Sequence, residues 1–92
     1  MTHEITAEYE GAILKLTFED TPNASLFING VNRETRTSAS NEITLKLNSV
    51  VQTGYEYHES IEARIHYKSD NIEAILCASD AELARKSIPI VL

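Results

Sequence analysis

Apolar and polar residues alternate with a period of two along much of this chain, which is typical of β-strands that bury one face. The clearest alternation runs through Ala12–Glu19 and Ile61–Tyr67. Other segments with a strand-like pattern are Ile5–Tyr9, Ala24–Ile28, Ile43–Leu47, Ile72–Ala78 and Ile88–Leu92. We therefore predict about seven short strands that share one core.

An Asn29-Gly30 pair lies between apolar, β-favouring residues. A two-residue type I′ turn requires positive φ at both central positions, and Asn and Gly tolerate this best. The sequence therefore predicts a hairpin with Ile28 opposite Val31, Phe27 opposite Asn32, and Leu26 opposite Arg33.

The outgoing arm of this hairpin loses its apolar face after Val31. Between Glu34 and Asn41 the only apolar residue is Ala39, so we expect a polar loop or an irregular edge there. Loops on a rigid β domain commonly carry recognition. The Asn29–Asn41 region is therefore a candidate contact surface.

One segment near the C-terminus interrupts the β pattern. Ser79 followed by Glu82 has the spacing of a helix capping box, and Arg85 and Lys86 would suit the end of a helix. We expect a short helical turn near Ser79–Lys86 that bridges two strands. Pro89 cannot donate to a ladder, which places the final strand at a sheet edge or begins it there.

The short strands and frequent turns favour an all-β fold, an antiparallel β-sandwich of about seven strands in a single domain covering residues 1–92. A small closed barrel is the alternative. Segments long enough for the helical crossovers of a parallel sheet are absent from the pattern.

Composition narrows the range of partners. The 92-residue chain has a formal net charge of −6, which argues against nucleic acid, and it has no apolar stretch long enough to span a bilayer. Met1–Glu4 lacks the start of a signal peptide, so we expect cytoplasmic synthesis, with virion association as one destination. Cys77 is the only cysteine and is expected to fill space beside Ile75 and Leu76.

Candidate chemistry is sparse. His58 and His66 could approach a metal ion with a nearby glutamate if their strands were neighbours, although their spacing matches no metal motif. The carboxylates of Glu56, Glu59 and Glu62 lack an apolar pocket that would raise one pKa for acid–base chemistry. We therefore predict a protein that is not an enzyme, with no catalytic residues, metal or cofactor.

In outline the chain resembles immunoglobulin-like and fibronectin-type β-sandwiches. The resemblance is carried by the strand spacing, the Leu26–Val31 hairpin, and Tyr57 ahead of the long strand Ile61–Tyr67. It implies a tyrosine corner at Tyr55 or Tyr57. The core tryptophan and paired cysteines of immunoglobulin domains are missing. Stand-alone domains of this kind also resemble small decoration and tail proteins of phage particles, and single modules of larger surface proteins.

The expected function is protein binding or structural assembly, through a protein partner or self-association at strand edges. Contacts are expected from Asn29–Asn41 and from the apolar C-terminal strand Ile88–Leu92. The candidate contact residues are Phe27, Asn29, Gly30, Arg33, Arg36, Ile88, Ile90 and Leu92. The alternative is a carbohydrate- or small-ligand-binding accessory domain, in which Phe27 or a tyrosine would be exposed on a concave surface.

Overall fold

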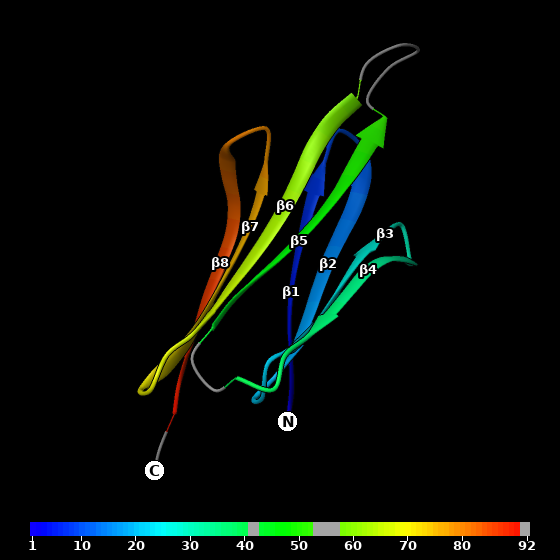
Figure 1. Ribbon diagram of the computed structural model, residues 1–92. Helices are drawn as coiled ribbons and strands as arrows, with labels where there is room; N and C mark the ends of the chain where they lie inside the picture. The colour runs from blue at the N-terminus through cyan, green and yellow to red at the C-terminus, as the bar shows by residue number, and fades with distance from the viewer. Residues whose placement is uncertain (41–42, 53–57, 91–92) are drawn as a thin grey trace.

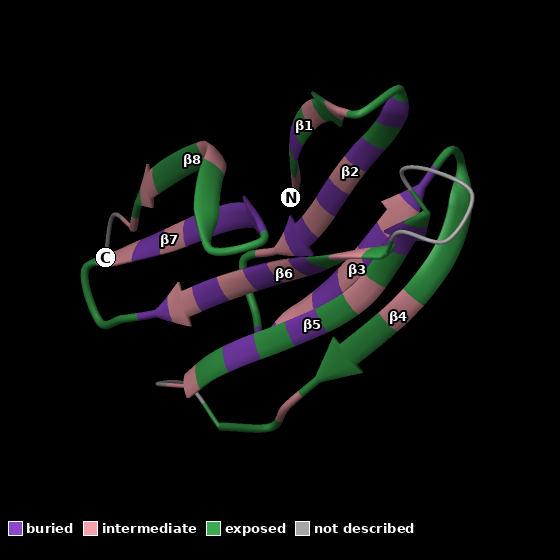
Figure 2. Cartoon of the chain, turned by 90° about the horizontal axis from the view of Figure 1, so that it is seen from above, coloured by how far each residue is buried: buried purple, intermediate pink, exposed green. Residues whose placement is uncertain are grey.

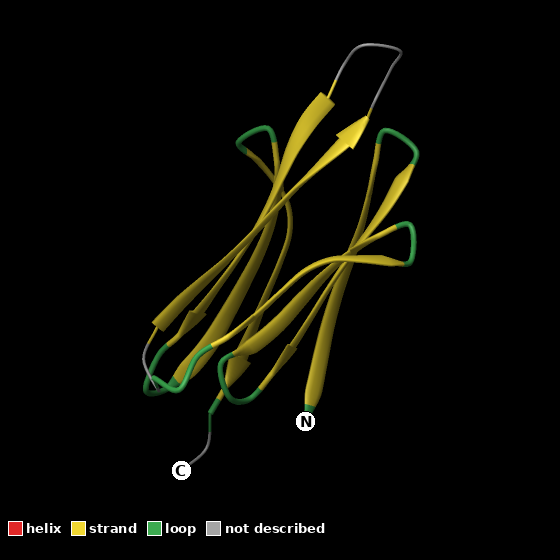
Figure 3. Ribbon diagram, turned by 45° about the vertical axis from the view of Figure 1, so that its right-hand side comes forward, coloured by secondary structure: helices red, strands yellow, loops and turns green. Residues whose placement is uncertain are grey.

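The computed structural model describes residues 1–40, 43–52 and 58–90 of the chain. Within these ranges the chain forms eight strands and no helix, and hence no helix long and apolar enough to cross a membrane (Figure 3). The strands are β1 (Thr2–Tyr9), β2 (Ala12–Glu19), β3 (Asn23–Ile28), β4 (Val31–Thr37), β5 (Ile43–Gln52), β6 (His58–Tyr67), β7 (Asn71–Ala78) and β8 (Ala81–Pro89).

The strands form two four-stranded antiparallel sheets, ordered β1-β2-β3-β4 and β5-β6-β7-β8 (Figure 1). Within the described residues, each strand therefore pairs through its backbone only with strands adjacent in the sequence, and the chain changes sheets once, between β4 and β5. This consecutive order differs from the Greek-key order of immunoglobulin domains. The immunoglobulin-like assignment is accordingly not confirmed, and the two separate sheets are not the closed barrel considered as an alternative.

Both sheets contribute to one hydrophobic core, because alternate residues of each inner strand are buried (Figure 2). The large side chains with almost no exposure are Leu14, Leu16, Phe18, Leu26, Leu47, Ile61, Ile65, Ile72 and Leu76. Burying one such side chain contributes roughly 1.5–3 kcal/mol. The period-two segments of the sequence thus correctly located the core-facing positions of β2 and β6.

Among the described residues, three hairpins turn through two residues that both have positive φ, the geometry of a type I′ turn. Asn29-Gly30 has φ values of 51° and 82°, which confirms the predicted turn. Glu10-Gly11 has the same values, and Ser79-Asp80 has 46° and 69°.

The helical turn predicted near Ser79–Lys86 is wrong. Ser79-Asp80 is a hairpin turn, and β8 starts at Ala81, which pairs with Ala78. The capping-box spacing favours a helix locally, but packing of Leu83, Ala84 and Ile88 against the core favours a strand. The last described strand is therefore Ala81–Pro89 rather than Ile88–Leu92. In the parts of the chain that the structure describes, the two sheets together contain eight strands rather than the predicted seven or so.

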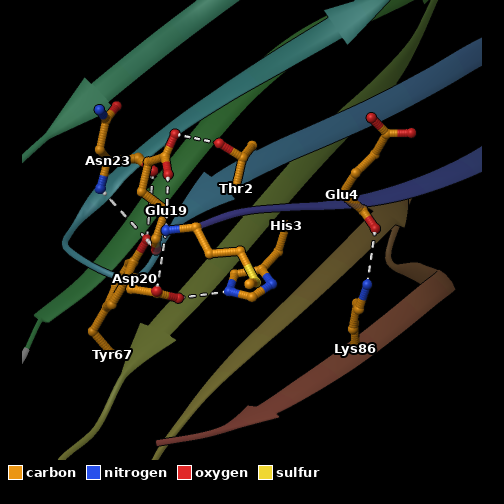
Figure 4. A network of polar contacts seen from close by, with 9 residues as sticks. Thr2, His3, Glu4, Glu19, Asp20, Asn23, Tyr67 and Lys86 are labelled. Atoms are coloured by element: carbon orange, nitrogen blue, oxygen red, sulfur yellow. Dashed lines mark hydrogen bonds and ion pairs between the residues drawn. The ribbon is translucent and has the colours of Figure 1, made fainter.

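Tyr67 and His3 join parts of the chain that are distant in sequence (Figure 4). The Tyr67 hydroxyl, at the end of β6, donates a 2.9 Å hydrogen bond to the carbonyl oxygen of Glu19 in the other sheet. The His3 ring packs on Phe18 with a centroid separation of 5.3 Å, and its Nε2 lies 2.6 Å from Asp20 Oδ1. These contacts hold the β2–β3 turn against both β1 and β6.

Candidate functional site

Strand β4 is the most exposed strand of the first sheet and forms one of its edges. Six of its seven residues are exposed, and Figure 2 shows this strand as a green band at the side of the molecule. The sequence predicted a polar loop or irregular edge over Glu34–Asn41, and the segment does lie at an edge, but it is a strand through Thr37 with one bulge. Backbone pairing with β3, rather than burial of an apolar face, makes this segment a strand.

The Asn29-Gly30 turn fixes where β4 begins. The Asn29 side-chain Oδ1 accepts the N–H of Ile13 at 2.9 Å, and the Asn29 N–H donates to the Ile13 carbonyl at 2.8 Å. Asn29 thus ties the hairpin to β2, and Gly30 completes the turn. These two candidate contact residues therefore position β4.

A β-bulge in β4 changes the predicted pairing. Ile28 pairs with Val31 and Phe27 with Asn32, as predicted, but Leu26 pairs with Glu34 instead of Arg33. Arg33 is the extra residue of the bulge, a feature common at sheet edges, where it ends the simple register. The bulge places Glu34 and Arg36 opposite the core residues Leu26 and Ala24.

The hydrogen-bond pattern shows which backbone groups of β4 face outward. Because Asn29 bonds to Ile13, the residues of β3 that face β4 are the even-numbered ones, and the Leu26 and Ala24 pairs with Glu34 and Arg36 are hydrogen-bonded. The N–H and C=O groups of Thr35 and Thr37 therefore point away from β3. No described residue pairs with these groups, so they offer a template for strand addition at the edge of the sheet.

Side chains on the two faces of β4 hold it in shape. On the core side, Arg36 Nε lies 3.0 Å from Glu34 Oε1, with the Arg36 side chain 59% exposed. On the outer side, Thr35 Oγ1 lies 2.8 Å from Ser25 Oγ and 3.1 Å from the Asn32 side-chain nitrogen. Arg36 was singled out as a contact residue from the sequence, whereas Glu34 and Thr35 lay within the predicted contact region 29–41 without being singled out. The β-branched Thr35 and Thr37 at alternate positions were the available signal for a strand.

Two shallow hollows flank β4. One, of about 410 Å³, separates β4 from β5 and is lined by Arg36, Thr37, Ser38, Ile43, Thr44, Leu45, Lys46 and Asn48. The other, of about 300 Å³, lies at the turn end and includes Asn29 and Arg33. The charged side chains of Arg33 and Arg36 therefore border both ends of the same edge.

The remaining predicted contact residues lie elsewhere. Phe27 is partly buried on the outer face of the first sheet, and the Lys15 ammonium lies 5.1 Å from its ring centroid. Ile88 and Ile90 pack against the core, and the Ile90 N–H donates to Asp70 at 2.9 Å. Leu92 lies outside the described residues, as do Tyr55 and Tyr57.

The edge formed by β8 differs in character from that of β4. Lys86 lies opposite the core residue Ala74, and its Nζ reaches the Glu4 carbonyl of β1 at 3.4 Å (Figure 4). An inward-pointing charge of this kind protects an edge from pairing with other chains. Pro89 further removes an N–H donor from the same strand. The Lys86 side chain thus reaches from the edge of β8 to β1 in the other sheet.

The distance between His58 and His66 excludes the metal site that the sequence suggested for them. His58 and His66 lie on the same face of β6, separated by about 26 Å at roughly 3.3 Å per residue, so the two rings cannot share an ion. In the described parts of the chain no three His, Cys, Asp or Glu side chains gather as a metal site would require. Glu56 lies outside those parts, whereas Glu59 bonds to Ser79 Oγ.

Two carboxylates at the surface have perturbed pKa values. The hydrogen bond from His3, followed by that from the terminal amino group, lowers the pKa of Asp20 below its usual value. The hydrogen bond from Arg85 similarly lowers the pKa of Glu82. Cys77 is buried as predicted, with its Sγ 3.8 Å from an Arg64 nitrogen. Both perturbed carboxylates therefore belong to ion pairs that join neighbouring parts of the fold.

Comparison of the chain with protein-family models, with curated proteins and with solved structures finds no match. The case for a function therefore depends on the geometry of β4.

Proposed function

We propose that this chain is a β-sandwich that acts as a non-enzymatic protein-binding or structural assembly module, with the β4 edge as its contact surface. Binding occurs by strand addition, in which a strand of the partner pairs with the outward-facing backbone groups of β4. A decoration or tail component of a virus particle is the assembly role that suits such a domain, and a module of a larger surface protein is the other.

The observation that carries this proposal is the open backbone edge at Thr35 and Thr37. Edge strands in monomeric proteins are commonly blunted by inward-pointing charges, proline or cover from another segment. Strand β8 has such protection in Lys86 and Pro89. On β4 the inward-pointing charges of Glu34 and Arg36 pair with each other at 3.0 Å, so a second strand that covered them would not bury a charge without a counter-charge.

Sugar binding receives less support from the same structure. A sugar stacks on an exposed aromatic face, and the Lys15 ammonium already lies over the Phe27 ring at 5.1 Å. The ring is also partly buried on a sheet face rather than in one of the hollows beside β4.

Site-specific photocrosslinking tests the proposal. Benzoylphenylalanine would be placed at Thr35 on β4 and, as a matched control, at Thr6 on the edge strand β1. In the native host we expect a discrete protein adduct from position 35 that is weak or absent from position 6. Equal adducts from both positions, or no adduct from position 35, would contradict the proposed function.

A further inference from the structure

We infer that the partner of the β4 edge is a second copy of this chain, an inference that rests on the proposed function. The two β4 strands would pair antiparallel about a twofold axis that passes between the two Thr35 residues. Such a pairing is isologous, because each copy presents the same surface to the other.

The backbone pattern suits this register. Thr35 points its N–H and C=O groups away from β3, so Thr35 and the partner's Thr35 would exchange two hydrogen bonds. Residues on either side of such a hydrogen-bonded pair face each other in a non-hydrogen-bonded pair, where side chains approach most closely. A twofold axis at Thr35 therefore brings Glu34 opposite the partner's Arg36.

The charges of β4 are self-complementary in that register. Glu34 would face the partner's Arg36, and Arg36 would face the partner's Glu34, so two ion pairs form across the axis. The side chains already lie together on the core-facing side of β4, with Nε and Oε1 3.0 Å apart. Moving the twofold axis by one residue in either direction would lose this match, because Glu34 would then face the partner's Glu34, or Arg36 the partner's Arg36.

Hydrogen bonds on the outer face of β4 order the strand before any partner binds. Thr35 Oγ1 is held by Ser25 and Asn32 at 2.8 and 3.1 Å, so the strand is ordered before it meets a partner. An ordered edge loses little conformational entropy on binding. A twofold axis perpendicular to the first sheet would place the second sheets of both copies on the same side of the joined first sheets. The dimer would then continue both layers of each copy.

Charge exchange tests the register directly. Glu34→Arg gives a chain with basic side chains at both positions, and Arg36→Glu gives a chain with acidic ones. By sedimentation velocity, we expect the unaltered protein to form a dimer and each single variant to dimerise at least about tenfold more weakly. A mixture of the two variants should form a heterodimer, and the double variant E34R/R36E should recover the homodimer. Circular dichroism would verify that each variant is folded.

Two results would overturn the inference: an unaltered protein that remains monomeric at its highest soluble concentration, or single variants that dimerise as well as their mixture. If the protein is monomeric but position 35 crosslinks to a different protein in the host, self-pairing fails while the proposed function stands. If position 35 forms no adduct and no dimer exists, both fail.

Discussion

The hydroxyl of Tyr67 donates a 2.9 Å hydrogen bond to the carbonyl oxygen of Glu19, which joins the end of β6 in one sheet to the end of β2 in the other. The N–H of Asn23 also reaches this hydroxyl, at 3.4 Å. Tyr67 is almost fully buried, so its phenol satisfies the β2–β3 turn where solvent cannot. The turn, in turn, sets the start of β3 and hence the hairpin that carries β4.

Removing this hydroxyl should loosen the contact between the sheets. Tyr67→Phe keeps the ring but leaves the Glu19 carbonyl without its donor, so we expect a loss of about 1–2 kcal/mol in the free energy of unfolding. Urea denaturation of the two proteins would measure it. Tyr9→Phe, on the partly exposed β1 position, is the control and should change stability little.

The same residue predicts how stability changes in alkali. Burial raises the pKa of Tyr67 above its usual 10.0, because the phenolate is disfavoured there. Because the pKa is higher in the folded state, the contribution of the neutral Tyr67 phenol to stability is fully present below about pH 10. This contribution is lost as the pH rises through the folded-state pKa. Above about pH 10, the free energy of unfolding should therefore fall more steeply with pH for the unaltered protein than for Tyr67→Phe. Parallel curves would contradict the role given to this phenol.

Acid should weaken the contact between β1 and the β2–β3 turn. His3 lowers the pKa of Asp20 below its usual 3.8, so the contribution of this carboxylate is present above that value. It is lost as the pH falls through the lower folded-state pKa. Asp20→Asn should therefore flatten the acid side of the stability profile, measured by thermal unfolding. An unchanged acid profile would show that the contact does not contribute.

The Ser79-Asp80 turn is a site where stability can be gained. Asp80 has a φ of 69°, which costs an L-residue free energy that glycine does not incur. Asp80→Gly should stabilise the protein by about 0.5–1 kcal/mol. Asp70→Gly, in a loop whose residues do not have positive φ, is the control and should destabilise slightly. A loss of stability in Asp80→Gly would contradict the assigned turn.

Much of the fold was predictable because the core-facing residues alternate. Ile61, Ala63 and Ile65 indicated both β6 and its buried face, and Asn29-Gly30 indicated the turn between β3 and β4. Ser79-Asp80 was interpreted as the start of a helix because it contains no glycine, the residue that usually marks a type I′ turn. Ser and Asp are also common helix caps, so the local sequence does not distinguish the two structures. The β4 register was misread because a bulge depends on the facing strand, and nothing in Asn32–Glu34 alone specifies an extra residue.

The candidate site was only partly predictable for a related reason. Arg33 and Arg36 stood out as charges in a polar segment, but the importance of Thr35 lies in the direction of its backbone groups. That direction follows from the hydrogen-bond pattern between β3 and Asn29, which no local pattern of side chains encodes.

The central claim is that the outward-facing backbone of Thr35 mediates association, and proline substitution addresses it directly. Thr35→Pro removes an N–H that β3 does not use, so the fold should persist. Thr6→Pro makes the equivalent change on β1, where the residues paired in hydrogen bonds with β2 are Ile5 and Ala7. In sedimentation velocity, Thr35→Pro should be monomeric while Thr6→Pro associates like the unaltered protein. Undiminished association of a folded Thr35→Pro would contradict the account.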